Sequence, residues 1–204
     1  MPPTRQATRI QQKNRAAILE AALEVFSAHG FRGATVDQIA AEAGLSKPNL
    51  LYYFPSKEAI HTELLEGLLD TWLDPLRELD AEGDPLDELL AYMRRKLEMS
   101  RDYPRESRLF ANEIIQGAPR IGDTLGTDLK QLVDEKAAVI DGWVARGQIA
   151  PVHAHHLIFS IWALTQHYAD FDVQVRAVLG KRDSDHFREA GLYLDQLFTK
   201  MLSI

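Results

Sequence analysis

An all-α fold of about nine helices is predicted by three observations on the sequence. Apolar residues recur with a helical period of about 3.6 in most segments. Gly and Pro fall between these segments, where helices end or begin, and no stretch alternates between apolar and polar residues as a strand does. With 46% hydrophobic and 26% charged residues, the 204-residue chain also has the composition of a globular protein.

The first predicted helices lie in the N-terminal third. A helix over 16–28 carries its apolar residues on one face and is followed by Gly30. Thr35 and Gln38 form a capping box at the start of a short second helix. Gly44 is expected to end that helix in a left-handed conformation.

A third short helix completes a helix-turn-helix pattern. Ser46 can cap it, and it runs from Lys47 to Tyr53 with Pro48 in its first turn. A helix of this size fits the DNA major groove, although an ordinary corner between two helices has the same pattern. The expected DNA-binding residues are Thr35, Lys47, Pro48, Asn49, Tyr52, Tyr53 and Lys57.

The rest of the chain predicts a helical body. Its helices are expected over 57–79, 86–101, 104–117, 123–146, 155–179 and 184–202. We expect two domains, a helix-turn-helix head with a basic N-terminal arm over 1–56 and a helical body over 57–204. The last two helices are more apolar than a small body needs, so a homodimer through them is expected. Their seam could pair with a second chain or pack within the monomer; it consists of Phe187, Leu194, Phe198 and Met201.

The charge is divided unevenly along the chain. The net charge of −7 argues against a nucleic-acid coat or a polybasic membrane binder. Residues 1–60, however, carry seven basic and five acidic side chains. Four basic residues precede the first acid and form the expected arm: Arg5, Arg9, Lys13 and Arg15. A basic head on an acidic body suggests two functions in one chain, although a solvated tail would look similar.

Several functional classes are excluded or lack a signature. There is no cysteine, so disulfides, thiolate metal sites and a cysteine nucleophile are excluded. We find no signal peptide and no apolar stretch long enough to span a membrane, so we expect a cytoplasmic protein that is nucleoid-associated when it binds DNA. We also find no nucleotide-binding or hydrolase motif, so we expect that the protein is not an enzyme. Metal binding by His153, His155 and His156 is conceivable, but their spacing does not place three imidazoles on one helix face. A solvated helix start is favoured, and we expect no metal and no cofactor.

The head resembles a known family of regulators. The string Ile39-Ala40, then Ala43-Gly44-Leu45-Ser46-Lys47, and the string from Phe54 to Ala59 are similar to the DNA-binding signature of the TetR family. Pro48 stands where the family usually has Gly, and Leu51 where it usually has Tyr. These departures leave the base contacts open.

The body resembles the pyrimidine-utilisation regulators of the same family. The similar segments are 100–104, 107–110 and 156–171. The resemblance implies a homodimer that binds double-stranded operator DNA, most simply as a repressor, and is released by uracil or thymine. It also implies that 1–56 is the DNA-binding domain and 57–204 the effector-binding and dimerisation domain. The alternatives are the same fold responding to another small molecule, such as a drug or a lipid, and a small α-helical enzyme acting on pyrimidines.

A pyrimidine needs a flat apolar wall and a side chain that both donates and accepts hydrogen bonds. Trp162, Gln166 and Asp170 are four residues apart and therefore share one helix face. We expect Trp162 to stack on the ring, Gln166 to pair with its edge, and Lys96 or Asp170 to complete the polar set; the alternative is that Trp162 and Gln166 belong to the core. The full expected ligand set is Trp72, Leu73, Lys96, Phe110, Trp162, Gln166 and Asp170.

Overall fold

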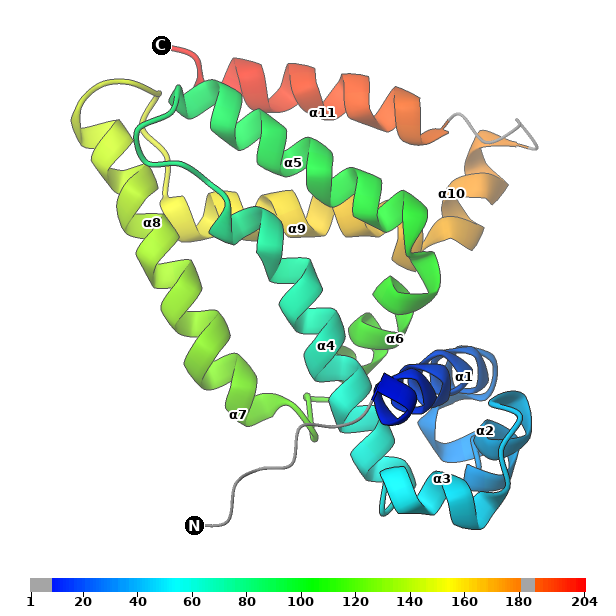
Figure 1. Cartoon of the computed structure of the whole chain (residues 1–204). Coiled ribbons are helices and arrows are strands. Elements are labelled where there is room, and N and C mark those ends of the chain that lie inside the picture. The colour runs from blue at the N-terminus through cyan, green and yellow to red at the C-terminus, as the bar shows by residue number, and fades with distance from the viewer. Residues whose placement is uncertain (1–8, 181–185) are drawn as a thin grey trace, which may run out of the picture. The chain divides into compact units, whose positions relative to one another are not determined.

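A computed structural model describes residues 9–180 and 186–204, and within these ranges it contains helices and no strand (Figure 1). The all-α prediction is confirmed. The chain divides into two compact units, Met1–Leu68 and Leu69–Ile204, which we call the head and the body. Among the described residues, no helix is both long enough and apolar enough to cross a membrane.

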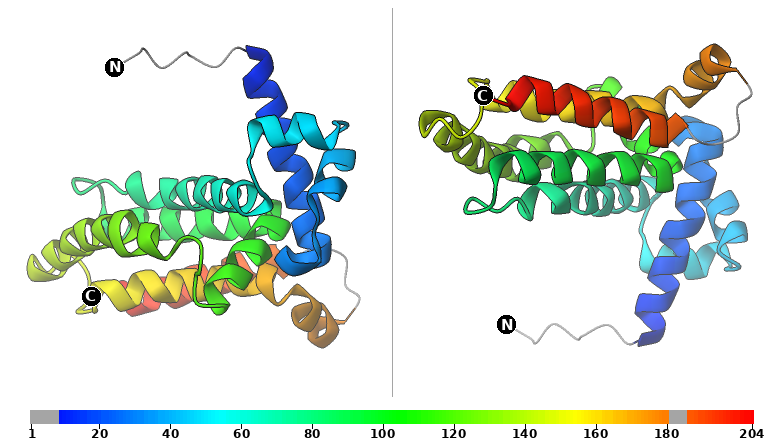
Figure 2. Two further views of the ribbon diagram at one scale, coloured as in Figure 1. Left: turned by 90° about the horizontal axis from the view of Figure 1, so that it is seen from below. Right: turned by 90° about the horizontal axis from the view of Figure 1, so that it is seen from above.

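The head contains α1 (Arg9–Gly33), α2 (Val36–Glu42), α3 (Lys47–Tyr53) and the first turns of α4 (Lys57–Arg77). Helices α2 and α3 lie beside α1 (Figure 2). The boundary expected after Ser56 falls before the structural division, because early α4 residues such as Ile60 and Leu65 are fully buried.

The predicted turn chemistry of the head is present. The Thr35 hydroxyl accepts a hydrogen bond from the Gln38 backbone N–H at 3.2 Å, and the Gln38 Oε1 accepts one from the Thr35 backbone N–H at 2.8 Å. Ser46 caps α3 by accepting from the Asn49 N–H at 3.4 Å. Gly44 has a φ of +66°, the left-handed conformation that glycine adopts without steric cost.

The body is built around α5 and α9. Helix α5 lies against both α9 and α11 (Figure 1), and α9 also contacts α6 and α8. The helices are α5 (Pro85–Asp102), α6 (Pro104–Ile115), α7 (Gly122–Thr124), a π-helical turn (Leu125–Leu129), α8 (Lys130–Ala145), α9 (Ala154–Asp170), α10 (Asp172–Leu179) and α11 (His186–Leu202).

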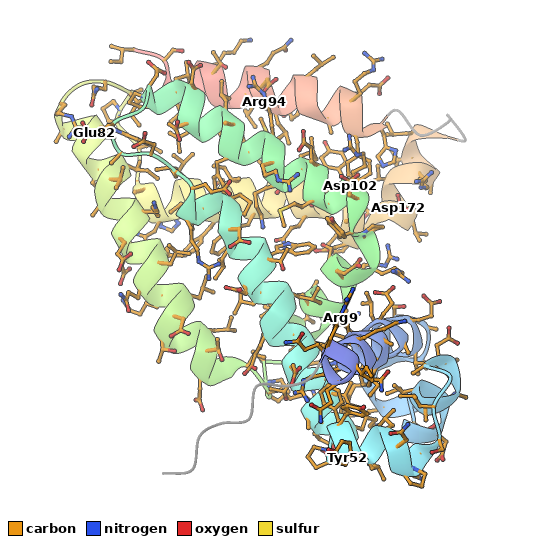
Figure 3. All side chains as sticks on the ribbon, in the orientation of Figure 1. Arg9, Tyr52, Glu82, Arg94, Asp102 and Asp172 are labelled. Carbon is orange, nitrogen blue, oxygen red and sulfur yellow. The ribbon has the colours of Figure 1, made fainter. Side chains whose placement is uncertain are left out.

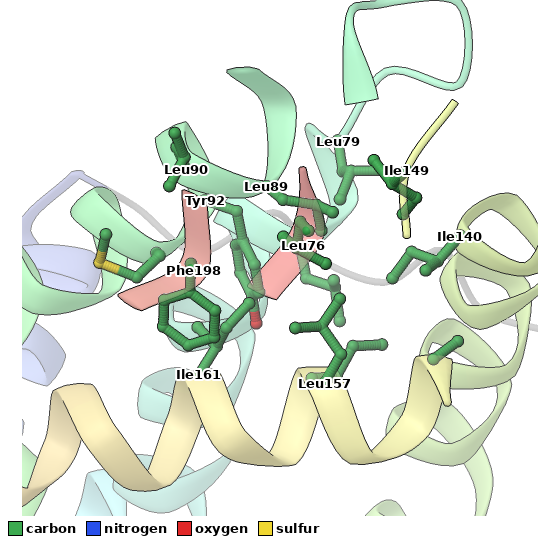
Figure 4. Close-up of a cluster of buried hydrophobic side chains, with 14 of the residues drawn as sticks. Leu76, Leu79, Leu89, Leu90, Tyr92, Ile140, Ile149, Leu157, Ile161 and Phe198 are labelled. Atoms are coloured by element: carbon green, nitrogen blue, oxygen red, sulfur yellow. The ribbon is translucent and has the colours of Figure 1, made fainter. Parts of the chain in front are cut away.

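One hydrophobic cluster joins α5, α8, α9 and α11 with the end of α4 (Figure 4). Leu89 and Tyr92 of α5 meet Leu157 and Ile161 of α9, and all four side chains are buried. Phe198 of α11 closes the cluster and is 2% exposed. The cluster fixes α5 and α9 against each other, and these two helices carry four residues of the ligand set expected from the sequence.

Two predicted helices are interrupted. The helix expected over 123–146 begins with α7 and a π-helical turn, where the Thr127 hydroxyl bonds the Asp123 carbonyl oxygen at 3.0 Å and competes with the regular backbone ladder. The helix expected over 155–179 breaks at Phe171. There the Arg108 side chain donates to the Ala169 carbonyl oxygen at 3.4 Å, which supplies that carbonyl with a partner outside the helix. These breaks raise the number of helices above the nine expected.

The predicted dimer seam on the last helix is wrong in part. Leu194 and Phe198 are 1% and 2% exposed and belong to the core of the same chain. Phe187 is half-buried against that core, and Met201 is 39% exposed. Besides Met201, the large apolar side chains that α11 presents to solvent are Leu192 and Tyr193, which were not predicted.

Candidate DNA-binding and ligand-binding sites

Helix α3 presents an exposed polar face. Lys47, Pro48, Asn49 and Tyr52 are all exposed, and Tyr52 (labelled in Figure 3) is 72% exposed. In contrast, Leu50 on the same helix is fully buried and anchors α3 to the head. The four exposed side chains are therefore free to contact a partner without disturbing the core.

Three of the predicted DNA-binding residues already have partners within the head. The Lys47 ammonium forms an ion pair with Asp37 at 2.9 Å, and both side chains are at least half exposed. Tyr53 is half-buried, and its hydroxyl accepts from the Asn14 amide at 2.8 Å, which ties α3 to α1. Thr35 is exposed, with its hydroxyl engaged in the capping box.

Lys57 has a structural use that the sequence interpretation missed. Its ammonium donates to the carbonyl oxygens of Phe31 at 2.7 Å and Ala34 at 2.8 Å, and it lies 4.4 Å from the centre of the Phe31 ring. These carbonyls follow the end of the regular part of α1, where backbone acceptors lack helical partners. The contact with phosphate expected at Lys57 through the start of α4 stays a prediction, whereas the Lys57 ammonium clamps α1 to α4.

The basic arm is largely helical. Arg5 lies outside the described residues, whereas Arg9, Lys13 and Arg15 belong to α1 (Arg9 is labelled in Figure 3). Arg15 forms a two-pronged pair with Glu63, with its Nε donating to Oε1 at 2.7 Å. Its guanidinium also lies 4.2 Å from the centre of the Phe54 ring, so Arg15 holds the head together.

A cavity of about 620 Å³ lies within the body. Helices α4, α5, α6 and α9 supply all seven side chains that the sequence interpretation proposed, and the structure brings them together on its walls. The remaining lining was not predicted and is mostly apolar: Leu69, Ala111, Ile114, Ile115, Leu125, Leu129 and Ala163. Leu69 could have been found, since it lies one turn before Leu73 on the same face of α4.

Helix α9 supplies a flat ring and an amide to one wall. Trp162 and Gln166 are both half-buried and line the cavity one turn apart. The Trp162 indole N–H donates to the Tyr92 hydroxyl at 2.6 Å, away from any cavity occupant. Gln166 has no hydrogen-bond partner among the described residues, so its amide can both donate to and accept from a ligand.

Asp170 lies a further turn along α9. Its Oδ1 accepts a hydrogen bond from the Ser107 hydroxyl at 2.6 Å. Burial raises the pKa of Asp170, while the Ser107 hydrogen bond and the nearby Arg108 and His167 partly oppose that shift. The carboxyl group therefore links α9 to α6 and leaves its second oxygen available as an acceptor.

Lys96 crosses from α5 to the same cavity. Its side chain is 2% exposed, and its ammonium donates to the Trp72 carbonyl oxygen at 3.2 Å and lies 5.4 Å from the centre of the Trp72 ring. Burial lowers the pKa of Lys96 to about 7. The Trp72 indole N–H is itself buried without a partner in the described structure.

The histidine cluster has ordinary surroundings. The His153 and His156 rings lie 4.6 Å apart, and His155 contacts Asp134 at 3.0 Å on the neighbouring helix. Among the described residues, no group of three or more His, Asp or Glu side chains is arranged to hold a metal ion. The cluster lies at the start of α9, where a solvated helix start was expected.

Comparison with family models divides the chain in the same way as its charge does. Residues 18–64 match the model for bacterial regulatory proteins of the tetR family, and residues 65–204 match the model for the C-terminal region of YcdC-like proteins.

Known proteins support the same assignment. The HTH-type transcriptional regulator RutR of Escherichia coli K12 is 52% identical over 188 residues, which cover 91% of this chain and 89% of the relative. The HTH-type transcriptional repressor KstR2 of Rhodococcus jostii is 35% identical over 82 residues, 40% of each chain. The solved structure of the fatty acid degradation regulator FadR from Bacillus halodurans has the same fold, with a TM-score of 0.69 at 18% identity over 95% of this chain and 96% of that one. These proteins are regulators rather than enzymes, and the chain belongs to the TetR family of bacterial transcriptional regulators.

Proposed function

We propose that the protein binds operator DNA as a dimer and is released from it by uracil or thymine. The observation that carries the proposal is the cavity in the body, where a flat indole, a free amide and a buried ammonium lie on the walls of one space. The 52% identity to RutR over most of the chain, and the resemblance to pyrimidine-utilisation regulators, support the choice of ligand.

The exposed face of α3 is suited to the major groove. Asn49 can pair with an adenine edge, and Tyr52 and Lys47 can reach bases or phosphates. Two heads in a symmetric dimer would meet half-sites roughly 34–36 Å apart. The exposed apolar side chains Phe159 of α9, with Leu192 and Tyr193 of α11, supply a surface for a second copy.

The imide edge of uracil presents an N–H donor between two carbonyl acceptors. Trp162 offers its ring face, because its N–H is already bonded to Tyr92. Gln166 can accept from the ring N–H or donate to a carbonyl, and the Lys96 ammonium can donate to another carbonyl. A ligand that reverses this pattern would leave a buried polar group unpaired, at a cost of about 1–3 kcal/mol.

Release from DNA follows from a shift in population. The ligand binds better to a form of the dimer in which the heads are wrongly spaced for the operator, and α4 connects the cavity wall to the head along the chain. Thermodynamic linkage requires the operator to weaken uracil binding by the same factor by which uracil weakens operator binding.

This reciprocity gives the test. Uracil affinity is measured by calorimetry with and without DNA from upstream of the gene, and DNA affinity with and without uracil. We expect equal factors in both directions for the wild type and a loss of uracil binding in Gln166→Leu with DNA binding retained. Cytosine, which reverses part of the hydrogen-bonding edge, is the control ligand. Equal uracil affinity with and without operator would refute the proposal.

A second candidate is a different, more apolar ligand. The cavity of about 620 Å³ is larger than a pyrimidine, and residues such as Ile114, Ile115 and Leu129 line part of it. Thermal unfolding separates the candidates, because a ligand at 100 times its dissociation constant adds about 2.7 kcal/mol of stability. A shift with a fatty acid or a drug but none with uracil or thymine would favour this candidate.

A further inference from the structure

Trp162 lines the cavity, but its polar group faces the core. An indole has a single N–H donor, and that of Trp162 is bonded to the Tyr92 hydroxyl at 2.6 Å. Trp162 therefore cannot donate to a ligand while this bond exists. It offers only its ring to the cavity.

Tyr92 lies behind this wall rather than in it. It is 4% exposed, belongs to the hydrophobic cluster of the body, and is absent from the cavity lining. A hydroxyl in such surroundings costs stability unless it is paired, and so does an indole N–H. Tyr92 and Trp162 satisfy each other across α5 and α9.

The bond also fixes the plane of the indole. Phe159, one turn before Trp162 on α9, packs against the same ring, with centroids 5.6 Å apart and planes inclined by 47°. The Trp162 indole is thus held at its edge by the hydrogen bond to Tyr92 and also contacts the ring of Phe159. Burial raises the pKa of Tyr92, so the phenol stays neutral over the physiological range.

We propose that Tyr92 is a positioning residue, which holds Trp162 as a flat stacking wall and thereby makes the cavity select planar rings. The inference rests on the proposed binding of a pyrimidine in this cavity. Tyr92 itself does not touch the ligand. Its loss should weaken stacking while leaving Gln166 and Lys96 in place to read the polar edge.

The test compares two ligands and four proteins. Uracil and 5,6-dihydrouracil share the same imide edge, but the second has a saturated, puckered ring. Calorimetry gives the affinities of the full-length wild type, Tyr92→Phe, Trp162→Phe and the double variant for both. Tyr168→Phe, at a half-buried position on α9 outside the cavity lining, is the matched control and should bind as the wild type does.

We expect Tyr92→Phe to weaken uracil binding about tenfold and to bring the uracil-to-dihydrouracil preference close to one. In the Trp162→Phe background the same substitution should have no further effect, because Tyr92 acts through Trp162. A uracil affinity in Tyr92→Phe equal to that of the wild type, or effects of the two substitutions that multiply, would overturn the inference.

A second measurement does not depend on the ligand. The chain has three tryptophans, so its indole N–H groups give three signals in a ¹H–¹⁵N spectrum, and Trp162→Phe assigns one of them. Tyr92→Phe should shift that signal and speed its hydrogen exchange; an unchanged signal would show that the bond does not hold the ring. If the wild type binds no pyrimidine but the signal responds, the proposed function fails while the positioning of Trp162 stands.

Discussion

The ammonium of Lys96 lies 3.2 Å from the carbonyl oxygen of Trp72, buried in the wall of the body cavity. No ion pair joins Lys96 to a carboxylate within the described parts of the chain. One carbonyl and one aromatic ring thus replace the hydration of a full charge. Burial lowers the pKa of Lys96 to about 7, so the charge is costly to the fold.

Replacing this lysine should stabilise the protein. Because the folded pKa is below the unfolded one, the unfolded chain binds more protons between pH 7 and about 10.5, and wild-type stability rises with pH across that range. We expect Lys96→Met to gain about 2–4 kcal/mol at pH 6, with the gain shrinking toward pH 10. Denaturant unfolding at several pH values measures it.

The control is Lys130→Met, at an exposed position on α8, which should show no such pH dependence. The same Lys96→Met variant should bind uracil more weakly, because a donor is lost from the cavity. Residues that serve function often lower stability, so we expect the Lys96→Met variant to be more stable and to bind uracil less tightly. A stability difference that is constant with pH would contradict the assignment.

The hydrogen bond from Ser107 to Asp170 supports the ionised carboxylate. Burial raises the pKa of Asp170 and the Ser107 hydroxyl lowers it, so Ser107→Ala should raise that pKa further. The folded state then holds its proton to higher pH, and stability falls as pH rises through the folded pKa. We expect Ser107→Ala to cost about 1–2 kcal/mol at pH 7 and less at pH 3.

Thermal unfolding across this pH range measures the effect. Ser160→Ala, at an exposed position on α9 where the hydroxyl bonds its own helix, is the matched control and should change stability by less than about 0.5 kcal/mol. An equal loss at both pH values would mean that the hydroxyl, not the charge of Asp170, accounts for the cost.

Lys57 and Lys47 should respond differently to removal of their charge. Lys57→Met removes the donor of two carbonyls in the head and should lower the free energy of unfolding by about 1–3 kcal/mol. Lys47→Met should change stability by about 0.5 kcal/mol or less. It should also reduce the slope of DNA affinity against salt concentration by the amount expected for about one phosphate contact. Unfolding curves and DNA binding at four salt concentrations distinguish the two. The opposite pattern would make the Lys57 ammonium, not that of Lys47, the phosphate ligand.

Local features of the fold could be predicted because short sequence patterns determine them. The Thr35 and Ser46 caps and the Gly44 turn depend on residues within four positions of each other, and the structure contains all three. The break after Asp170 could not be predicted, because Arg108, far away in the sequence, supplies the partner of the carbonyl at the end of α9.

The same distinction applies to the sites. The spacing of Trp162 and Gln166 and the family resemblance were sufficient to place them on one wall, but no pattern linked either of them to Tyr92, 70 positions from Trp162. Periodicity on α11 identified an apolar face without saying what covers it. The apolar pattern therefore leaves open whether Leu194 and Phe198 form a dimer interface or pack within the monomer. In the structure both lie in the core of the chain.

Asp37 should restrain DNA binding through its ion pair with Lys47. Both side chains are at least half exposed, so the 2.9 Å contact contributes little to stability. A carboxylate beside a candidate phosphate ligand, however, repels the DNA backbone and competes for the ammonium. We expect Asp37→Asn to strengthen operator binding by about three- to tenfold at low salt, with the gain fading as salt screens the charges.

Loss of an acidic residue from the first turn of α2 should cost about 0.3–1 kcal/mol of stability. Fluorescence anisotropy with labelled operator measures the affinity, and Glu42→Gln at the exposed end of α2 is the control for a general change in net charge. The same gain in both variants would show that net charge, not release of Lys47, strengthens binding.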